Sequence, residues 1–118
     1  MKKEIDLFIN EFSERKAENI VVVDLEPSEH PMTDQLIIAS ALNDVHLKSL
    51  VDSILRFYKK NKAEAFQELD YFGASGKPES RWVILDFNDI VIHIMDQEIR
   101  EQYDFDNLFA AYENYRYH

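Results

Sequence analysis

Residues 81–95, RWVILDFNDIVIHIM, constrain the fold more than any other stretch of the chain. Two runs rich in β-branched and aromatic residues, 82–87 and 90–95, are separated by Asn88 and Asp89, and this pattern predicts a β-hairpin. Both central residues tolerate positive φ, which favours a type I′ turn. Because side chains alternate between the two faces of a strand, the hairpin register assigns every residue to one face.

The two predicted faces of the hairpin differ in composition. The residues of the first face are all apolar: Val83, Leu85, Phe87, Ile90, Ile92 and Ile94. The second face mixes apolar and polar residues: Trp82, Ile84, Asp86, Val91, His93 and Met95. We expect the first face to lie in the core.

The second face has two interpretations, and the pattern alone leaves both open. In the first, helices cover this face, Trp82 and Met95 are core residues, and the two polar side chains, Asp86 and His93, hydrogen-bond to each other or to nearby backbone. Alternatively the face is partly open, and a tryptophan and a methionine ringed by polar residues form a protein-binding surface.

The remaining elements are predicted from the spacing of apolar residues. The expected elements are a helix over 3–17, strands over 20–23 and 35–40, a helix over 44–61 capped by Asn43 or Asp44, a strand over 63–72 and a loop over 73–80. After Asp96 we expect one or two helices that pack Ile99, Tyr103, Leu108, Phe109 and Tyr112 inward, with Asp104 or Asp106 as a cap between them. The order α-β-β-α-β-β-β-α predicts a single α/β domain over 1–118 with a mixed five-stranded sheet packed with helices.

The net charge of the chain limits the classes of partner that it can bind. The formal net charge is -10, so binding of nucleic acid by phosphate neutralisation, which needs clustered Lys and Arg, is disfavoured. A basic protein surface is a more natural partner than RNA or an anionic membrane. The chain has no cysteine, no run near the roughly 18 apolar residues of a membrane span, and no unbroken apolar stretch near its start. We expect a soluble, cytoplasmic protein without disulfides.

No catalytic motif stands out. The four histidines, His30, His46, His93 and His118, do not form HExxH or a comparable spacing, and each is expected to be solvated or hydrogen-bonded. The two glycines, Gly73 and Gly76, are too few for a phosphate-binding loop. Four acids that follow or flank strands are conceivable ligands of a divalent ion, but nothing fixes their convergence: Asp24, Asp34, Asp86 and Asp89. We therefore expect a binding module with no cofactor and no metal, rather than an enzyme.

Three blocks of the chain resemble the ribosomal silencing factors, also called Iojap-like proteins. The blocks are KAENIVVVDLE, TDQLIIASALNDVHLKSLVDSI and RWVILDFNDIVIHIMDQEIREQYDFDNLF. The last is the most specific, and the family pattern falls there on Trp82, Asp86, Asp89, His93, Arg100, Tyr103, Leu108 and Phe109. The chain departs from the pattern at Asn88, where the family has glycine, at Ser40-Ala41, where it has Thr-Gly, and at Phe109, where it has tryptophan.

The resemblance implies a function and a site. It implies a factor that binds the large ribosomal subunit through the subunit's fourteenth protein, blocks joining of the small subunit and lowers translation when nutrients are scarce. It also implies a fold related to nucleotidyltransferases, although fold relation alone carries no activity. The expected docking residues are Trp82, Ile84, Asp86, His93 and Met95 at the centre, with Asp89 and Arg100 at the rim. Two alternatives remain: a metal-dependent nucleotidyl transfer enzyme that uses Asp24, Asp34 or Asp86, and a homodimer that buries the same face.

Overall fold

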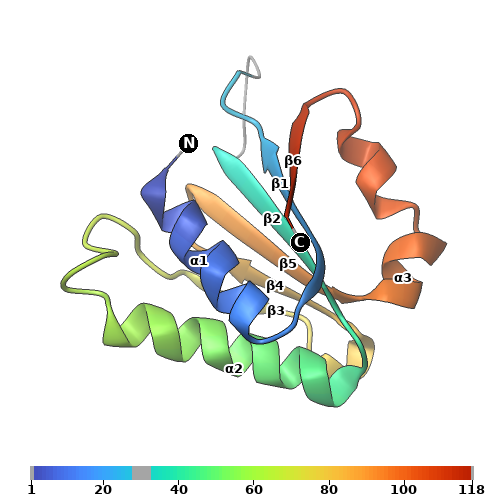
Figure 1. Ribbon diagram of the computed structural model, residues 1–118, viewed down its shortest axis with the longest axis horizontal. Coiled ribbons are helices and arrows are strands. Elements are labelled where there is room, and N and C mark those ends of the chain that lie inside the picture. Colours follow the sequence, from blue (N-terminus) through green and yellow to red (C-terminus); the bar gives the residue numbers. More distant parts are fainter. Residues whose placement is uncertain (1, 28–32, 118) are drawn as a thin grey trace.

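One six-stranded sheet organises the computed structural model, which describes residues 2–27 and 33–117 (Figure 1). The helices are α1 (Lys3–Glu14), α2 (Asp44–Lys60) and α3 (Gln97–Gln102), with short 3-10 helices η1 (Pro78–Ser80) and η2 (Phe105–Phe109). The strands are β1 (Glu18–Asp24), β2 (Gln35–Ala41), β3 (Gly73–Ser75), β4 (Trp82–Asp86), β5 (Ile90–Asp96) and β6 (Glu113–Tyr117).

The strand order is β3-β4-β5-β2-β1-β6. Strands β2 and β5 are parallel and the other neighbours are antiparallel, so the prediction of an α/β fold with a mixed sheet is confirmed. The sheet has six strands instead of the expected five.

Helices α1 and α2 cover one face of the sheet, as Figure 1 shows. Each helix buries one apolar stripe, which in α1 consists of Ile5, Phe8, Ile9 and Phe12 at the predicted helical spacing. The side chain of Asn43 caps α2 by accepting a hydrogen bond from the backbone N–H of His46, at 2.8 Å. Both helices confirm the sequence prediction, although α1 ends at Glu14 instead of residue 17.

The segment α3–η2 lies on the opposite face of the sheet (Figure 1). It packs a smaller apolar cluster against β1, β2 and β5, with Phe105 as its buried ring. All seven residues of β2 are buried, because helices cover this central strand on one face and the cluster covers it on the other.

The predicted strand over 63–72 is wrong. The segment forms turns that bury Phe66 and Leu69 at the end of the core, where Phe66 stacks on Phe8 with 5.0 Å between ring centroids. The backbone carbonyl of Leu69 accepts a hydrogen bond from the hydroxyl of Tyr58. The strand that pairs with β4 is instead β3, within the stretch expected to be a loop.

The chain after Asp96 is helical only as far as Phe109, and the strand β6 was not predicted. Ile99 and Phe109 pack inward as expected, but three of the residues expected to point inward are exposed: Tyr103, Leu108 and Tyr112. Asp104 precedes η2 without a side-chain capping bond.

The hairpin turn differs from the expected class. Asn88 has φ of 66°, but Asp89 is not among the residues with positive φ, whereas a type I′ turn needs positive φ at both positions. The backbone N–H of Asp89 donates to the carbonyl of Phe87 at 2.9 Å, and the carboxylate of Asp86 accepts from the N–H of Asn88 at 2.8 Å. Asn88 is therefore the one turn residue with a left-handed backbone conformation.

Candidate functional site

The hairpin register confirms the two faces derived from the sequence. Trp82 pairs with Met95, Ile84 with His93 and Asp86 with Val91, so these six side chains share the face opposite α1 and α2. Met95 is fully buried and Asp86 is exposed, while the other four residues are partly exposed. The face is therefore covered at the end near Met95 and accessible at the end near Asp86.

Trp82 and His93 are joined directly. The indole Nε1–H of Trp82 donates to Nδ1 of His93 at 3.0 Å. Because Nδ1 accepts this bond, the proton of the neutral imidazole is on Nε2. Burial lowers the pKa of His93 to about 4, which keeps the ring neutral at physiological pH. The expected partner Asp86 bonds to the turn instead, so no Asp-His pair exists here for acid-base chemistry.

Aromatic rings surround Trp82 and fix its orientation. Its ring centroid lies 5.3 Å from that of Phe105 in an edge-to-face arrangement and 5.9 Å from that of Tyr103. The ring of His93 lies 4.9 Å from that of Phe105. Tyr103 is 62% exposed and extends the accessible area beyond the hairpin. We call the accessible residues Trp82, Ile84, Asp86, Val91, His93 and Tyr103 the Trp82 surface.

Arg100 does not occupy an exposed rim, contrary to the expectation. Its side chain is only 4% exposed. Two of its nitrogens, Nε and Nη2, bond the two carboxylate oxygens of Asp106 at 2.7 Å each. Its Nη1 donates to the backbone carbonyl of Asn19 at 2.6 Å and to Oγ of Ser40 at 2.8 Å. The buried guanidinium therefore connects the α3–η2 segment to β1 through Asn19 and to β2 through Ser40.

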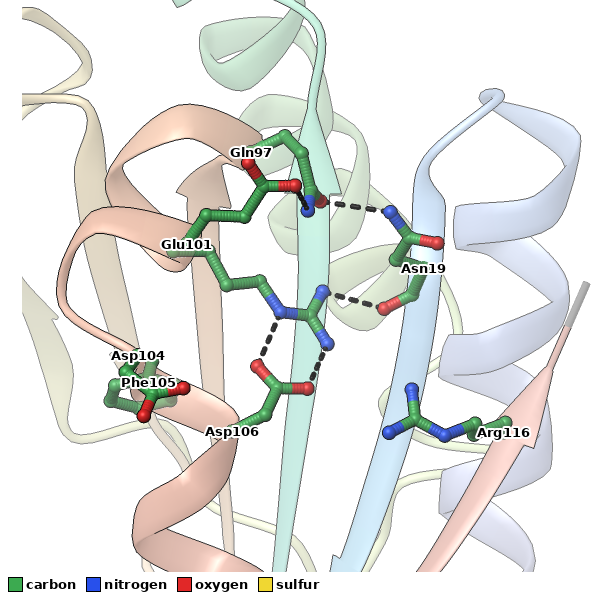
Figure 2. A pocket seen from close by; sticks show the side chains of 8 residues that line it. Asn19, Gln97, Glu101, Asp104, Phe105, Asp106 and Arg116 are labelled. Atoms are coloured by element: carbon green, nitrogen blue, oxygen red, sulfur yellow. Dashed lines mark hydrogen bonds and ion pairs between the residues drawn. The ribbon is translucent and has the colours of Figure 1, made fainter.

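This ion pair lies in a polar pocket of about 390 Å³. Figure 2 shows Asp106 among the side chains that line the pocket. The side-chain amide of Asn19 donates to Oε1 of Gln97 at 2.8 Å across it. The guanidinium of Arg100 holds the pKa of Asp106 below its usual range, chiefly through their hydrogen bonds. Because Arg100 and Asp106 bond each other and Asn19 bonds Gln97, we interpret this ion pair as a structural brace.

Sequence reasoning missed three members of this site: Asn19, Ser40 and Phe105. Phe105 could have been found, because it lies four residues before Phe109 and would share a helical face with it. The contacts of Arg100 with Asn19 and Ser40 join positions 81 and 60 residues apart, for which a single sequence carries no signal.

The carboxylates considered as metal ligands have other partners. Asp34 pairs with the ammonium of Lys2 at 3.1 Å, and Asp24 accepts from the side-chain amide of Gln35 at 3.2 Å. The carboxylate of Asp89 lies 3.4 Å from the side-chain amide of Asn88. Within residues 2–27 and 33–117, no three His, Asp or Glu side chains gather in a group that could hold a metal ion.

Of the other three histidines, the structure describes His46. Nδ1 of His46 accepts from the backbone N–H of Leu42 at 2.9 Å, and its Nε2 lies 2.9 Å from the carbonyl of Arg15, which confirms a hydrogen-bonded histidine. His30 and His118 lie outside the described residues. Over the part of the chain that the structure describes, no helix has the length and apolarity needed to span a membrane.

Comparison with known families gives a match over nearly the whole chain. A family model described as "Ribosomal silencing factor during starvation" matches residues 1–117. The mouse protein "Mitochondrial assembly of ribosomal large subunit protein 1" is 31% identical over 109 residues, which are 92% of this chain but 46% of that protein. The "Ribosomal silencing factor RsfS" of Haemophilus influenzae is 28% identical over 79 residues, which are 67% of this chain and 72% of that protein. The chain therefore spans about half the length of the mouse relative.

Two solved structures share the fold. A protein from Chromobacterium violaceum has a TM-score of 0.77 at 24% identity, covering 92% of this chain and 86% of that one. A protein from Bacillus halodurans has a TM-score of 0.72 at 19% identity, covering 90% and 92%. At this level of identity the likeness concerns the fold.

Proposed function

The chain belongs to the family of ribosomal silencing factors, and from that premise we propose that it binds the large ribosomal subunit through the subunit's fourteenth protein. The bound domain occupies space that the small subunit needs, so it prevents subunit joining and represses translation when nutrients are scarce. The family consists of non-enzymatic regulators that act on the ribosome, in agreement with the expected binding module.

The accessible tryptophan of the Trp82 surface is the observation that carries this proposal. Trp82 is held in one orientation by His93 and by two neighbouring aromatic rings. A large side chain that is already ordered loses little entropy on binding and contributes a large contact area, which is the usual property of an interface hot spot. Ile84 and Val91 extend the apolar area beside it.

The remaining residues of the expected site have two roles in the proposal. Asp86 and Asp89 give one edge of the surface a negative charge, which complements a basic ribosomal protein and accelerates association. Met95 and Arg100 are buried and support the surface from beneath. Of the expected residues, direct contact with the partner is therefore assigned to Trp82, Ile84, Asp86 and His93, with Asp89 at the edge. The exposed ring of Tyr103 is added to this contact area.

Substitution of Trp82 tests the proposal. Trp82→Ala should weaken binding to purified large subunits by about 2 to 4 kcal/mol, which is about 30- to 1000-fold in Kd, measured by co-sedimentation. Tyr103→Ala should also weaken binding, and because Tyr103 is largely exposed its loss leaves the core intact. Leu42→Ala removes a comparably exposed apolar side chain outside the Trp82 surface and should bind like the parent.

Two further readouts belong to the same experiment. Parent protein should reduce the joining of purified subunits in a sedimentation profile, and binding should weaken with added salt because of the acidic edge. Equal binding by the parent and by a folded Trp82→Ala variant would remove the site assignment. Light scattering that showed a dimer for the parent and a monomer for Trp82→Ala would instead support the homodimer alternative. No observation favours the nucleotidyl transfer alternative.

The compartment follows from the same proposal. A cytoplasmic factor acting on cytoplasmic ribosomes is proposed here, whereas the mouse relative and the "Protein Iojap-related, mitochondrial" of Arabidopsis thaliana carry mitochondrial names. Fluorescence microscopy of the tagged protein in its own cells separates these compartments.

A further inference from the structure

Helix α2 has a charge opposite in sign to that of the chain. The whole chain has 13 basic and 23 acidic residues. Within α2 the basic residues Lys48, Arg56, Lys59 and Lys60 outnumber the acidic residues Asp44 and Asp52. A net negative charge therefore conceals a local excess of positive charge on one helix.

Part of this charge lines a groove between α1 and α2. Two adjoining hollows of about 270 and 180 Å³ share Arg15, Ser53 and Arg56 in their walls. Lys48 lies at one end of the groove and Lys60 at the other. We call this concavity the α1–α2 groove.

The acids of the groove are already neutralised. Glu11 accepts from Nε of Arg15 at 3.1 Å and from the hydroxyl of Ser53, and Asp52 pairs with the ammonium of Lys48 at 2.8 Å. Arg56 and Lys60 form no ion pair with any residue that the structure describes, and both side chains are exposed. These two cations are free to bind a ligand, and Lys48 can join them, because its ion pair with Asp52 is exposed on both sides and therefore weak.

The spacing of the cations favours a polymeric anion. Lys48, Arg56 and Lys60 lie along about 18 Å of helix axis, since each residue advances the helix by about 1.5 Å. One phosphate ion cannot contact all three, whereas a nucleic acid strand presents phosphates repeatedly along its length. A concave wall with arginines also suits phosphate oxygens, which accept paired hydrogen bonds from a guanidinium.

We propose that the α1–α2 groove binds the phosphate backbone of RNA, without regard to base sequence. Helices α1 and α2 lie on the face of the sheet opposite the α3–η2 segment (Figure 1). The groove between these two helices and the Trp82 surface can therefore be occupied at once. The inference goes beyond the proposed docking function and does not depend on it. It departs from the expectation, based on net charge alone, that phosphate binding is disfavoured.

Anisotropy of a labelled single-stranded RNA of mixed sequence and about 12 nucleotides tests the proposal. With three phosphate contacts, log K for the parent should fall with log salt at a slope of about -2. The double variant Arg56→Glu/Lys60→Glu should bind at least tenfold more weakly and with a shallower slope. Both positions are exposed on a helix and glutamate is a good helix former, so the fold is retained.

The control variant is Lys3→Glu/Lys77→Glu, which makes a similar change in net charge at exposed positions outside the groove. It should bind RNA within about threefold of the parent. Equal weakening by both double variants would reveal a net-charge effect and overturn the groove assignment, as would undiminished binding by Arg56→Glu/Lys60→Glu.

Displacement of RNA by inorganic phosphate at equal phosphate concentration would overturn the assignment to a polymer. Trp82→Ala should bind RNA like the parent, which separates this test from that of ribosome docking.

Discussion

At the scale of single residues, the bond from Trp82 to His93 decides how the mixed face of the hairpin behaves. The alternation of the sequence was sufficient to place both residues on one face. It did not reveal that the indole would be the partner of the histidine, because the pairing depends on ring orientation within the aromatic cluster. A polar residue on an apolar strand face is thus satisfied by the side chain beside it.

His93 makes stability depend on pH. Its pKa is about 4 in the folded protein and about 6.5 in the unfolded chain, so between these values the unfolded chain binds a proton that the folded protein does not. Stability should therefore fall as pH drops from about 6.5 to 4, by on the order of 3 kcal/mol in all, and this group adds no dependence above that range. Urea unfolding at several pH values measures the effect.

His93→Gln is the control for this prediction. Its side-chain oxygen can still accept the indole hydrogen bond but does not titrate. Carboxylates contribute equally to both proteins, so the stability difference between parent and variant isolates His93. Parallel pH profiles for the two proteins would contradict the assigned titration.

Asn88 shows where sequence reasoning about turns is limited. The prediction that a residue with positive φ would occupy the turn is confirmed at Asn88. The turn class was wrong because contacts outside the hairpin hold the loop. The hydroxyl of Thr33 donates to the carbonyl of Asn88, and the backbone N–H groups of Asp34 and Gln35 donate to the carbonyl of Asp89.

At the scale of elements, α3–η2 depends on one ion pair. The segment is short, and its helix α3 has six residues, too few for stability on its own. Its position on the sheet is fixed by Phe105 and by the contacts of Arg100. Because Tyr103 and Phe105 both contact Trp82, this brace also shapes the Trp82 surface.

Asp106→Asn should release this segment. The substitution leaves the buried guanidinium of Arg100 without a counter-charge, which should cost roughly 2 to 3 kcal/mol of unfolding free energy, less than a wholly buried pair because the Asp106 side chain is 32% exposed. Hydrogen exchange should accelerate at the amides of 97–109. Asp104→Asn makes the same charge change at an exposed residue and should stay within about 0.5 kcal/mol of the parent. Equal protection of 97–109 in both variants would refute the brace.

The success of prediction varied between elements for physical reasons. Long elements with one strong period, such as α2 and β5, were predicted because burial on one face determines them. The segment 63–72 was predicted to be a strand because it is rich in apolar residues. Phe66 and Leu69 are buried at the end of the core, where turns are sufficient to bury them and no regular alternation of side chains is needed. Strand β6 was mistaken for helix, although the alternating Tyr115 and Tyr117 are typical of a strand.

At the scale of the whole molecule, β6 keeps the edge of β1 from being exposed to solvent. It pairs along β1 from Ile20 to Asp24, and β1 would otherwise present the edge of a valine-rich strand to solvent. The most exposed strand of the sheet thus covers the edge of one of the most buried.

Removing the residues after Tyr112 should expose this edge. Stability should fall by on the order of 2 to 4 kcal/mol, because several ladder hydrogen bonds are lost at about 1 kcal/mol net each. The truncated protein should also associate, as seen by light scattering, since an unpaired apolar edge is a template for pairing between chains. Tyr115→Thr keeps the backbone ladder and should remain as dispersed as the parent. A truncated protein that is equally stable and dispersed would show that β6 is dispensable.

The single tryptophan of the chain gives this molecule an internal spectroscopic probe. Its indole lies in the proposed docking surface and on the opposite side of the sheet from the α1–α2 groove. A partner that covers Trp82 removes water from the ring and shifts its emission to shorter wavelength, whereas a ligand in the groove leaves the emission maximum unchanged. Intrinsic fluorescence therefore distinguishes occupancy of the two faces in one unlabelled sample.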